Sequence, residues 1–253
     1  MAGTEIIIEP GAAQLAKKGA EIFCHTAKES VATKGYFVVA VSGGSTPRAM
    51  HRLLSEGPYV TEIPWEATHI FWTDERVVPL EDPESNFGAA KEDFLDRSPI
   101  SPAQIHPMPA WMPPEEGADL YQEELEGFFQ GLGNDNPAFD LILLGVGKDG
   151  HIASLFPAQG ALDERKRWVM AVKGGNPYMN RLTMTHPIIN HARQIVFLVS
   201  GMGKSEILRT IFENRQLGLP AQRVKPLDGK LTWLIDRDAA SLLSEGIIQA
   251  APQ

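Results

Sequence analysis

Short apolar runs alternate along the chain with longer segments in which apolar residues recur every three or four positions. The short runs are typical of buried strands, and the longer spacing is typical of amphipathic helices. The runs predict strands over residues 6–8, 36–41, 68–72, 141–144, 168–172, 181–185, 194–199 and 231–235. The helical spacing predicts helices over 11–31, 47–54, 88–95, 115–130 and 204–212, and a last helix from Asp236 or Asp238 to about Ala250.

This alternation favours an α/β fold with three layers, in which helices cover both faces of a mostly parallel, Rossmann-like sheet. The connection over 98–114 contains six prolines, as a linker does, but the same rhythm of helix and strand resumes after it. We therefore expect residues 1–253 to form a single domain. Loops that follow parallel strands gather at one edge of such a sheet, where ligands bind.

Composition narrows the classes of ligand and compartment. The chain is 22% charged and carries a formal net charge of −9, which excludes a general surface for nucleic acid or anionic membrane. An anionic ligand therefore needs a local cluster of basic groups. No apolar run has the length of a membrane span, and the N-terminus lacks the pattern of a signal peptide. The lone cysteine, Cys24, cannot form an intrachain disulfide, which fits a reducing compartment, and its predicted helix indicates a buried structural residue. We therefore expect a cytoplasmic protein.

A glycine-rich turn, SGGSTP at 42–47, lies between a predicted strand and a predicted helix. Gly43 and Gly44 let backbone N–H groups approach a ligand, Ser45 and Thr46 add hydroxyl donors, and the helix N-terminus adds partial positive charge. These properties suit a phosphate monoester, and an ordinary tight turn is the alternative. The spacing of a P-loop is absent.

A second turn, GMGK at 201–204, places Lys204 at the start of a predicted helix. A lysine there opposes the helix macrodipole, and a bound anion would offset that cost. A solvated surface lysine is the alternative. Arg181 lies on a predicted half-exposed strand, and its periodicity leaves open whether it reaches the same pocket.

The glycines of GVGKDGH at 145–151 follow a buried strand and match the dinucleotide pattern GxGxxG. Two features count against a dinucleotide site. Pro157 ends the helix predicted from near Gly150 at or before Phe156, in fewer than two turns, and the next strand ends in Lys173 in place of a ribose-binding acid. The stretch instead delivers Lys148, Asp149 and His151 to a strand end, and histidine exchanges protons near neutral pH. HExxH, Cys/His clusters and GxSxG are absent, so neither a metal nor a serine nucleophile is implied.

Five motifs in order resemble the 6-phosphogluconolactonase family, hydrolases of the pentose phosphate pathway: SGGSTP at 42–47, TDERVVP at 73–79, SNFG at 85–88, LLGVGKDGHIASLFP at 143–157 and VSGMGK at 199–204. The related glucosamine-6-phosphate deaminases share a similar phosphate loop and the DGHIA motif. They carry Asn-Glu-Pro where this chain has Leu155-Phe156-Pro157, and Asp-Glu-Tyr where it has Asp74-Glu75-Arg76. Both departures favour the lactonase.

The resemblance implies a sugar-phosphate isomerase-like fold and hydrolysis of 6-phospho-D-glucono-1,5-lactone to 6-phospho-D-gluconate by a monomer or homodimer without cofactor or metal. His151 is then the general base, Asp149 orients it, and Arg76 donates to the oxyanion. The residues expected to bind substrate are Gly43, Gly44, Ser45, Thr46, Asp74, Lys148, Arg181 and Lys204. The phosphate is expected on the turn at 43–46, with Arg181 and Lys204 supplying charge.

Two other functions stay open at this point. One is a glucosamine-6-phosphate isomerase or deaminase on the same fold, which an assay for ammonia release separates from the lactonase. The other is a catalytically idle regulator that binds a sugar phosphate, which lactone turnover above the spontaneous rate would exclude.

Overall fold

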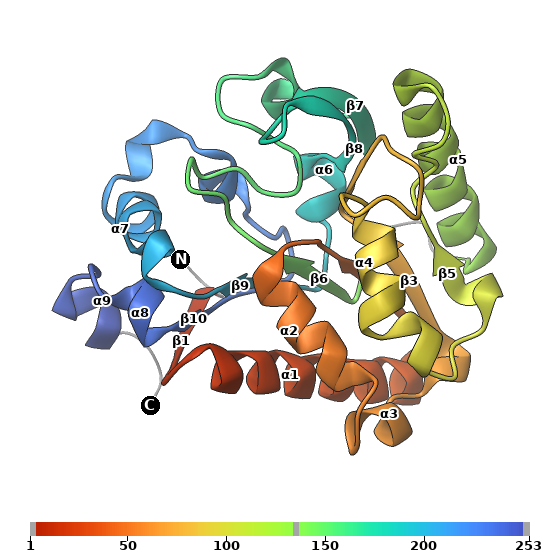
Figure 1. The fold of residues 1–253 in the computed structure, drawn as a ribbon, viewed down its shortest axis with the longest axis horizontal. Helices are drawn as coiled ribbons and strands as arrows, with labels where there is room; N and C mark the ends of the chain where they lie inside the picture. The colour runs from red at the N-terminus through yellow and green to blue at the C-terminus, as the bar shows by residue number, and fades with distance from the viewer. Residues whose placement is uncertain (1–3, 134–136, 250–253) are drawn as a thin grey trace.

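The computed structural model describes residues 4–133 and 137–249 and confirms the α/β prediction (Figure 1). Within this part of the chain, seven strands form a sheet in the order β1-β10-β9-β6-β2-β3-β5, and every neighbouring pair is parallel. Their bounds are β1 Thr4–Glu9, β2 Phe37–Val41, β3 Thr68–Trp72, β5 Ile105–His106, β6 Leu141–Leu144, β9 Gln194–Val199 and β10 Lys230–Asp236.

The central strands form because both of their faces are covered. Every residue of β2 and β6 is buried, as expected for a parallel sheet between two helical layers. Neighbouring side chains of a strand point to opposite faces, so Trp72 meets Phe87 of α4 (Asn86–Asp93) while Phe71 meets Phe128 of α5 (Pro114–Gly131). The two helices therefore cover opposite faces. In Figure 1, α1 (Ala12–Lys34) runs along the bottom of the view, and α2 (Ser45–Leu54) descends obliquely to pack against it.

Three further strands form a separate antiparallel sheet in the order β4-β8-β7, with bounds Asp74–Arg76, Met179–Met184 and Val169–Gly174. The strands predicted over 168–172 and 181–185 exist, but their apolar pattern did not separate them from the main sheet. Strand β4, directly after β3, was not predicted. Its register with β8 pairs Arg76 with Arg181 and Asp74 with Thr183.

The helix predicted from Gly150 to before Phe156 is wrong. The segment forms a tight turn in which Ile152 and Leu155 make an isolated bridge and Ala153 has φ +46°. The Ser154 N–H donates to Thr183 Oγ1 at 3.1 Å, so a contact distant in sequence satisfies a backbone group that a helix would have satisfied locally.

The predicted last helix is divided into α8 (Arg237–Ala240) and α9 (Glu245–Gln249), and Ala250 lies outside the described residues. Asp236 accepts from the N–H of Ala239, as predicted for a cap. The other helices are α3 Tyr59–Glu62, α6 His186–Ile189 and α7 Ser205–Glu213. Helix α2 begins at Ser45, two residues before Pro47, which was predicted to open it. None of the described helices has both the length and the apolar character that crossing a bilayer requires.

His51 of α2 is buried at 2% exposure against the ring of Phe94, with 5.1 Å between ring centroids. Its Nε2 has no hydrogen-bond partner among the described residues. Burial lowers the pKa of His51 to about 4, and Asp93 offsets this only in part. The folded protein therefore keeps this imidazole neutral, whereas the unfolded chain protonates it near pH 6.5.

We expect the free energy of unfolding to fall as pH falls from about 6.5 to about 4, because only the unfolded chain takes up this proton; His51 contributes about 3 kcal/mol to that loss. His51→Leu should remove this contribution. Urea unfolding of the two proteins at pH 7 and pH 4.5 measures it. If the free energy of unfolding fell by the same amount between pH 7 and pH 4.5 in His51→Leu as in wild type, the assignment to His51 would be contradicted.

Candidate functional site

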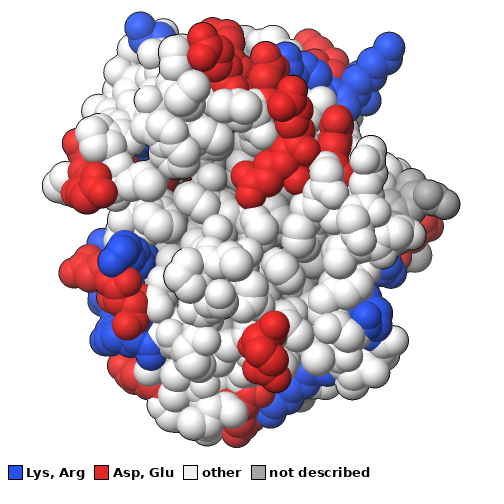
Figure 2. Space-filling model, turned by 90° about the vertical axis from the view of Figure 1, so that its right-hand side faces the viewer, with Lys and Arg blue, Asp and Glu red and all other residues white. Residues whose placement is uncertain are grey.

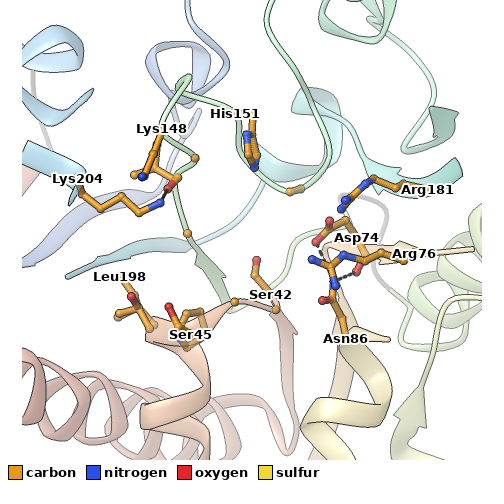
Figure 3. Close-up of a pocket in the computed structure, with 18 residues that line it drawn as sticks. Ser42, Ser45, Asp74, Arg76, Asn86, Lys148, His151, Arg181, Leu198 and Lys204 are labelled. Atoms are coloured by element: carbon orange, nitrogen blue, oxygen red, sulfur yellow. Dashed lines mark hydrogen bonds between the residues drawn. The ribbon is translucent and has the colours of Figure 1, made fainter. Parts of the chain in front are cut away.

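A pocket of about 270 Å³ lies at the edge of the sheet where β2, β6 and β9 end (Figure 3). The loops that follow these three strands line it together with β4, β8 and the start of α4. The pocket contains ten of the eleven residues predicted for the site: Gly43, Gly44, Ser45, Thr46, Asp74, Arg76, Lys148, His151, Arg181 and Lys204. The eleventh, Asp149, lies behind His151 and contacts its ring.

The glycine turn after β2 presents a helix N-terminus to the pocket. Gly44 has φ +102° and is the N-cap of α2, and no side chain caps this end. The first N–H groups of a helix have no partner within the helix, so those of residues 45 and 46 are donors for a ligand. Gly43 is needed for close packing, because a Cβ there would lie 1.9 Å from Oδ1 of Asn86.

Lys148 and Lys204 lie on the same side of the pocket in Figure 3. Lys204 Nζ donates to the backbone oxygen of Val146 at 2.7 Å. Burial lowers the pKa of Lys204, and the charge of Lys148 lowers it further. Lys148 is exposed and Lys204 is half-buried, and an anion between the two ammonium groups would relieve their repulsion.

His151 and Asp149 form a hydrogen-bonded pair. Nδ1 of His151 is 2.5 Å from Oδ1 of Asp149, whose oxygen also accepts the backbone N–H of His151 at 3.1 Å. Burial favours the neutral carboxyl, but the charge and hydrogen bonds of His151 outweigh it and hold the pKa of Asp149 below its usual value. A carboxylate on Nδ1 fixes the proton there and leaves Nε2 as the free base. In Figure 3 the ring points into the pocket.

The opposite side of the pocket carries Arg76, Arg181 and Asp74. Arg181 is 5% exposed and donates from Nε to the oxygen of Gly174 at 3.0 Å. Burial, followed by the charge of Arg76, lowers the pKa of its guanidinium. Oδ2 of Asp74 accepts from Ser154 Oγ at 2.6 Å, which ties the His151 loop to β4. Arg181 and Lys204 thus line one pocket from opposite sides.

Seven pocket residues outside the predicted set, besides Pro47, are Ser42, Asn86, Gly145, Val146, Gly147, Ala153 and Leu198. Most lie within the quoted motifs, so the signal existed, but a motif does not say which of its side chains faces a ligand. Leu198 is an apolar residue of a buried strand, and its sequence carries no such signal. Among the described residues, no group of three or more His, Cys, Asp or Glu side chains has the arrangement of a metal site.

Comparisons with other proteins agree with this arrangement. Residues 10–233 match the family of glucosamine-6-phosphate isomerases and 6-phosphogluconolactonases. The chain is 43% identical over 219 residues to a 6-phosphogluconolactonase of Synechocystis sp., covering 85% of this chain and 88% of that protein.

Two solved structures have a similar fold. A 6-phosphogluconolactonase from Trypanosoma cruzi matches with a TM-score of 0.83 and 26% identity over 95% of this chain and 97% of its own. A monomeric glucosamine-6-phosphate deaminase matches with a TM-score of 0.80 over 94% of this chain and 99% of its own. Its 23% identity shows a shared fold alone.

Replacement of Gly147 by alanine should break the hydrogen bond between Nδ1 of His151 and Oδ1 of Asp149. Its Cβ would lie 2.1 Å from Cε1 and Nδ1 of His151, so the ring has to turn away. We expect the downfield NMR resonance of the hydrogen-bonded imidazole proton to disappear in Gly147→Ala while the protein stays folded. Gly145→Ala is the matched control, because a Cβ there meets nothing within 4 Å. Persistence of the resonance in Gly147→Ala would show that the pair does not depend on this close approach.

Proposed function

Because the chain belongs to the family of glucosamine-6-phosphate isomerases and 6-phosphogluconolactonases, we propose that it hydrolyses 6-phospho-D-glucono-1,5-lactone with His151 as the general base. The chain is a hydrolase of the 6-phosphogluconolactonase branch of that family. One observation supports this mechanism above the others: a histidine held by Asp149 turns its free ring nitrogen into a pocket lined by basic side chains.

The phosphate of the substrate would bind the turn at residues 43–46, with Lys204 and Lys148 supplying positive charge. Because the chain has a net charge of −9, a dianion needs such a local cluster of charged donors. Figure 2 shows the face that α5 covers, with acidic side chains gathered on its upper part, where a phosphate would be repelled. Binding the phosphate also fixes the lactone carbonyl relative to His151.

His151 would take a proton through Nε2 from the water that attacks C1 of the lactone. As the water oxygen bonds to C1, the electron pair of the C=O π bond moves to the carbonyl oxygen, which becomes an oxyanion, and Arg76 would donate a hydrogen bond to it. As the bond between C1 and the ring oxygen breaks, the imidazolium would return its proton to that oxygen, giving the open-chain acid. Asp149, which remains ionised, would stabilise the imidazolium between the two transfers.

Arg181 lies across the pocket from Lys204 and next to Arg76 in Figure 3. We therefore assign it to the same end of the substrate as Arg76 and Asp74. Arg181 is held rigidly, since its guanidinium lies over the ring of Phe156 at 5.8 Å and bonds to Gly174. Its charge would attract the substrate and limit where the sugar ring lies.

Phe156 supports the lactonase over the deaminase. Its ring lies 4.9 Å from that of His151, centroid to centroid, and the residue is 7% exposed. By the resemblance, the deaminases carry a glutamate at this position, and that acid would assist the opening of the sugar ring. An apolar ring there supplies no proton donor, so amine release lacks its acid.

We also propose that the protein works in the cytoplasm as a monomer or homodimer without cofactor. Cys24 is the lone cysteine and cannot form an intrachain disulfide, which supports a reducing compartment.

His151→Ala should lower kcat by about 10²–10⁴ because the general base is lost. The assay follows acid production from the lactone after subtraction of the spontaneous rate. His191→Ala, at an exposed histidine, is the matched control and should keep its turnover. Near-normal kcat in folded His151→Ala would remove this residue from the mechanism.

Lys204→Ala should raise KM about 10- to 100-fold with a smaller change in kcat, since a charged hydrogen bond to phosphate contributes about 1.5–3 kcal/mol. Arg181→Ala should raise KM as well. Inhibition by inorganic phosphate separates the two: it should weaken in Lys204→Ala and change little in Arg181→Ala. The reverse order of the two effects would place the phosphate beside Arg181.

A further inference from the structure

Asn86 lies on the pocket wall, although no role was assigned to it from the sequence. It is the first residue of α4, is 5% exposed and lines the pocket between Gly43 and Asp74 (Figure 3). Its Nδ2 donates to the backbone oxygen of Asp74 at 2.8 Å and to Oδ1 of Asp74 at 3.3 Å. Both partners are acceptors.

These two contacts fix which way the amide faces. If the amide were reversed, its oxygen would meet two oxygens of Asp74 and lose both hydrogen bonds. The Oδ1 atom must therefore face away from Asp74, toward Gly43, where only a residue without Cβ leaves room for it. Among the described residues, no group donates to this oxygen. It is an acceptor held ready at the pocket wall.

A buried carboxylate holds Asn86 in this position. Glu75 is fully buried and accepts the N–H groups of Arg76, Asn86 and Phe87, each at 2.7 Å, and the hydroxyl of Ser85 at 3.1 Å. Burial raises the pKa of Glu75 despite these donors. This side chain therefore joins β4 to the start of α4, and it sets both Arg76 and Asn86 without lining the pocket itself.

The pocket is rich in donors and poor in acceptors. Lys and Arg side chains only donate, and four of them line it: Arg76, Lys148, Arg181 and Lys204. The hydroxyls of a sugar ring also need acceptors for their protons. Asp74 supplies one carboxylate, but its Oδ2 already accepts from Ser154.

We propose that Asn86 accepts a hydrogen bond from a ring hydroxyl of the sugar lactone through Oδ1, and that Glu75 is the positioning residue that aims it. This rests on the proposed function and adds a residue that recognises the sugar apart from its phosphate. A binding site with a fixed acceptor discriminates against an analogue that lacks the matching hydroxyl, because the oxygen is then left without a partner.

The test compares wild type and Asn86→Ala on the intact lactone and on its 2-deoxy, 3-deoxy and 4-deoxy analogues. On the intact lactone, kcat/KM should fall about tenfold in the variant, as expected for one hydrogen bond. On one of the deoxy analogues the two proteins should react equally. The proposal would be overturned if the ratio of kcat/KM between wild type and Asn86→Ala were the same on all four substrates, or if the variant lost no kcat/KM on any of them.

Two further measurements distinguish a failure of the proposed function from a failure of the role proposed for Asn86. Turnover by wild type above the spontaneous rate tests the proposed function alone. Calorimetric binding of glucose 6-phosphate, whose ring keeps the 2-, 3- and 4-hydroxyls, should weaken about tenfold in Asn86→Ala whether or not turnover is observed, and unchanged binding would overturn the role of Asn86. Asn190→Ala is the matched control, because Asn190 bonds to Arg223 and Lys225 outside the pocket, and both quantities should stay as in wild type.

Glu75→Gln tests the positioning role. It replaces an accepting oxygen with an NH₂ group that cannot accept from Ser85 or Phe87. Its kcat/KM should fall, and the double variant with Asn86→Ala should lose less than the product of the two single losses, because both act on one contact. Losses that multiply would show that Glu75 does not act through Asn86.

Discussion

The parallel pairing of β6 with β2 and β9 is the constraint on which the pocket depends. Parallel neighbours end at the same edge, so the three loops after them must meet there. Each loop is a glycine-rich turn, and each brings a different group: the N-terminus of α2, the pair of Asp149 and His151, and Lys204. Since all of β2 and β6 is buried, the register of these strands cannot slip without exposing core residues, and the loops are held on a rigid base.

The small antiparallel sheet completes the site from the other side. The pairing of β4 with β8 places Arg76 next to Arg181, and the bond between Ser154 and Asp74 fastens this sheet to the His151 loop. Burial of Arg181, and after it the charge of the neighbouring Arg76, disfavours the charged guanidinium and lowers its pKa, so this arrangement costs free energy. An anionic, hydroxyl-rich substrate would offset that cost. The same arginines would therefore lower the stability of the free protein and strengthen its binding of substrate.

Charge and shape together separate the proposed reaction from that of the related deaminases. The cations of the pocket suit any sugar phosphate, and the shared fold hosts both activities. In this chain Phe156 packs on the imidazole of His151, at the position where the resemblance implies an acid in the deaminases. Recognition of the sugar would depend on Asp74 and Asn86, whose orientations are set by contacts behind the pocket wall.

Local pattern by itself determined the buried strands, the glycine turns between strand and helix, and the residues that these turns carry. Nine of the ten predicted residues that line the pocket follow the ends of the parallel strands β2, β3, β6 and β9, and these ends meet by a topology that follows from alternation. The tenth, Arg181, lies on β8 outside that sheet and was expected from the family resemblance. Only the tertiary structure decided that β7 and β8 leave the main sheet, that residues 150–156 turn instead of forming a helix, and that Arg181 faces Lys204 across the pocket. The tertiary structure also placed Asn86 on the pocket wall. Each of these outcomes depends on a hydrogen bond or packing contact between residues far apart in sequence, such as Ser154 with Asp74 or Glu75 with Asn86, and periodicity within one segment carries no information about such partners.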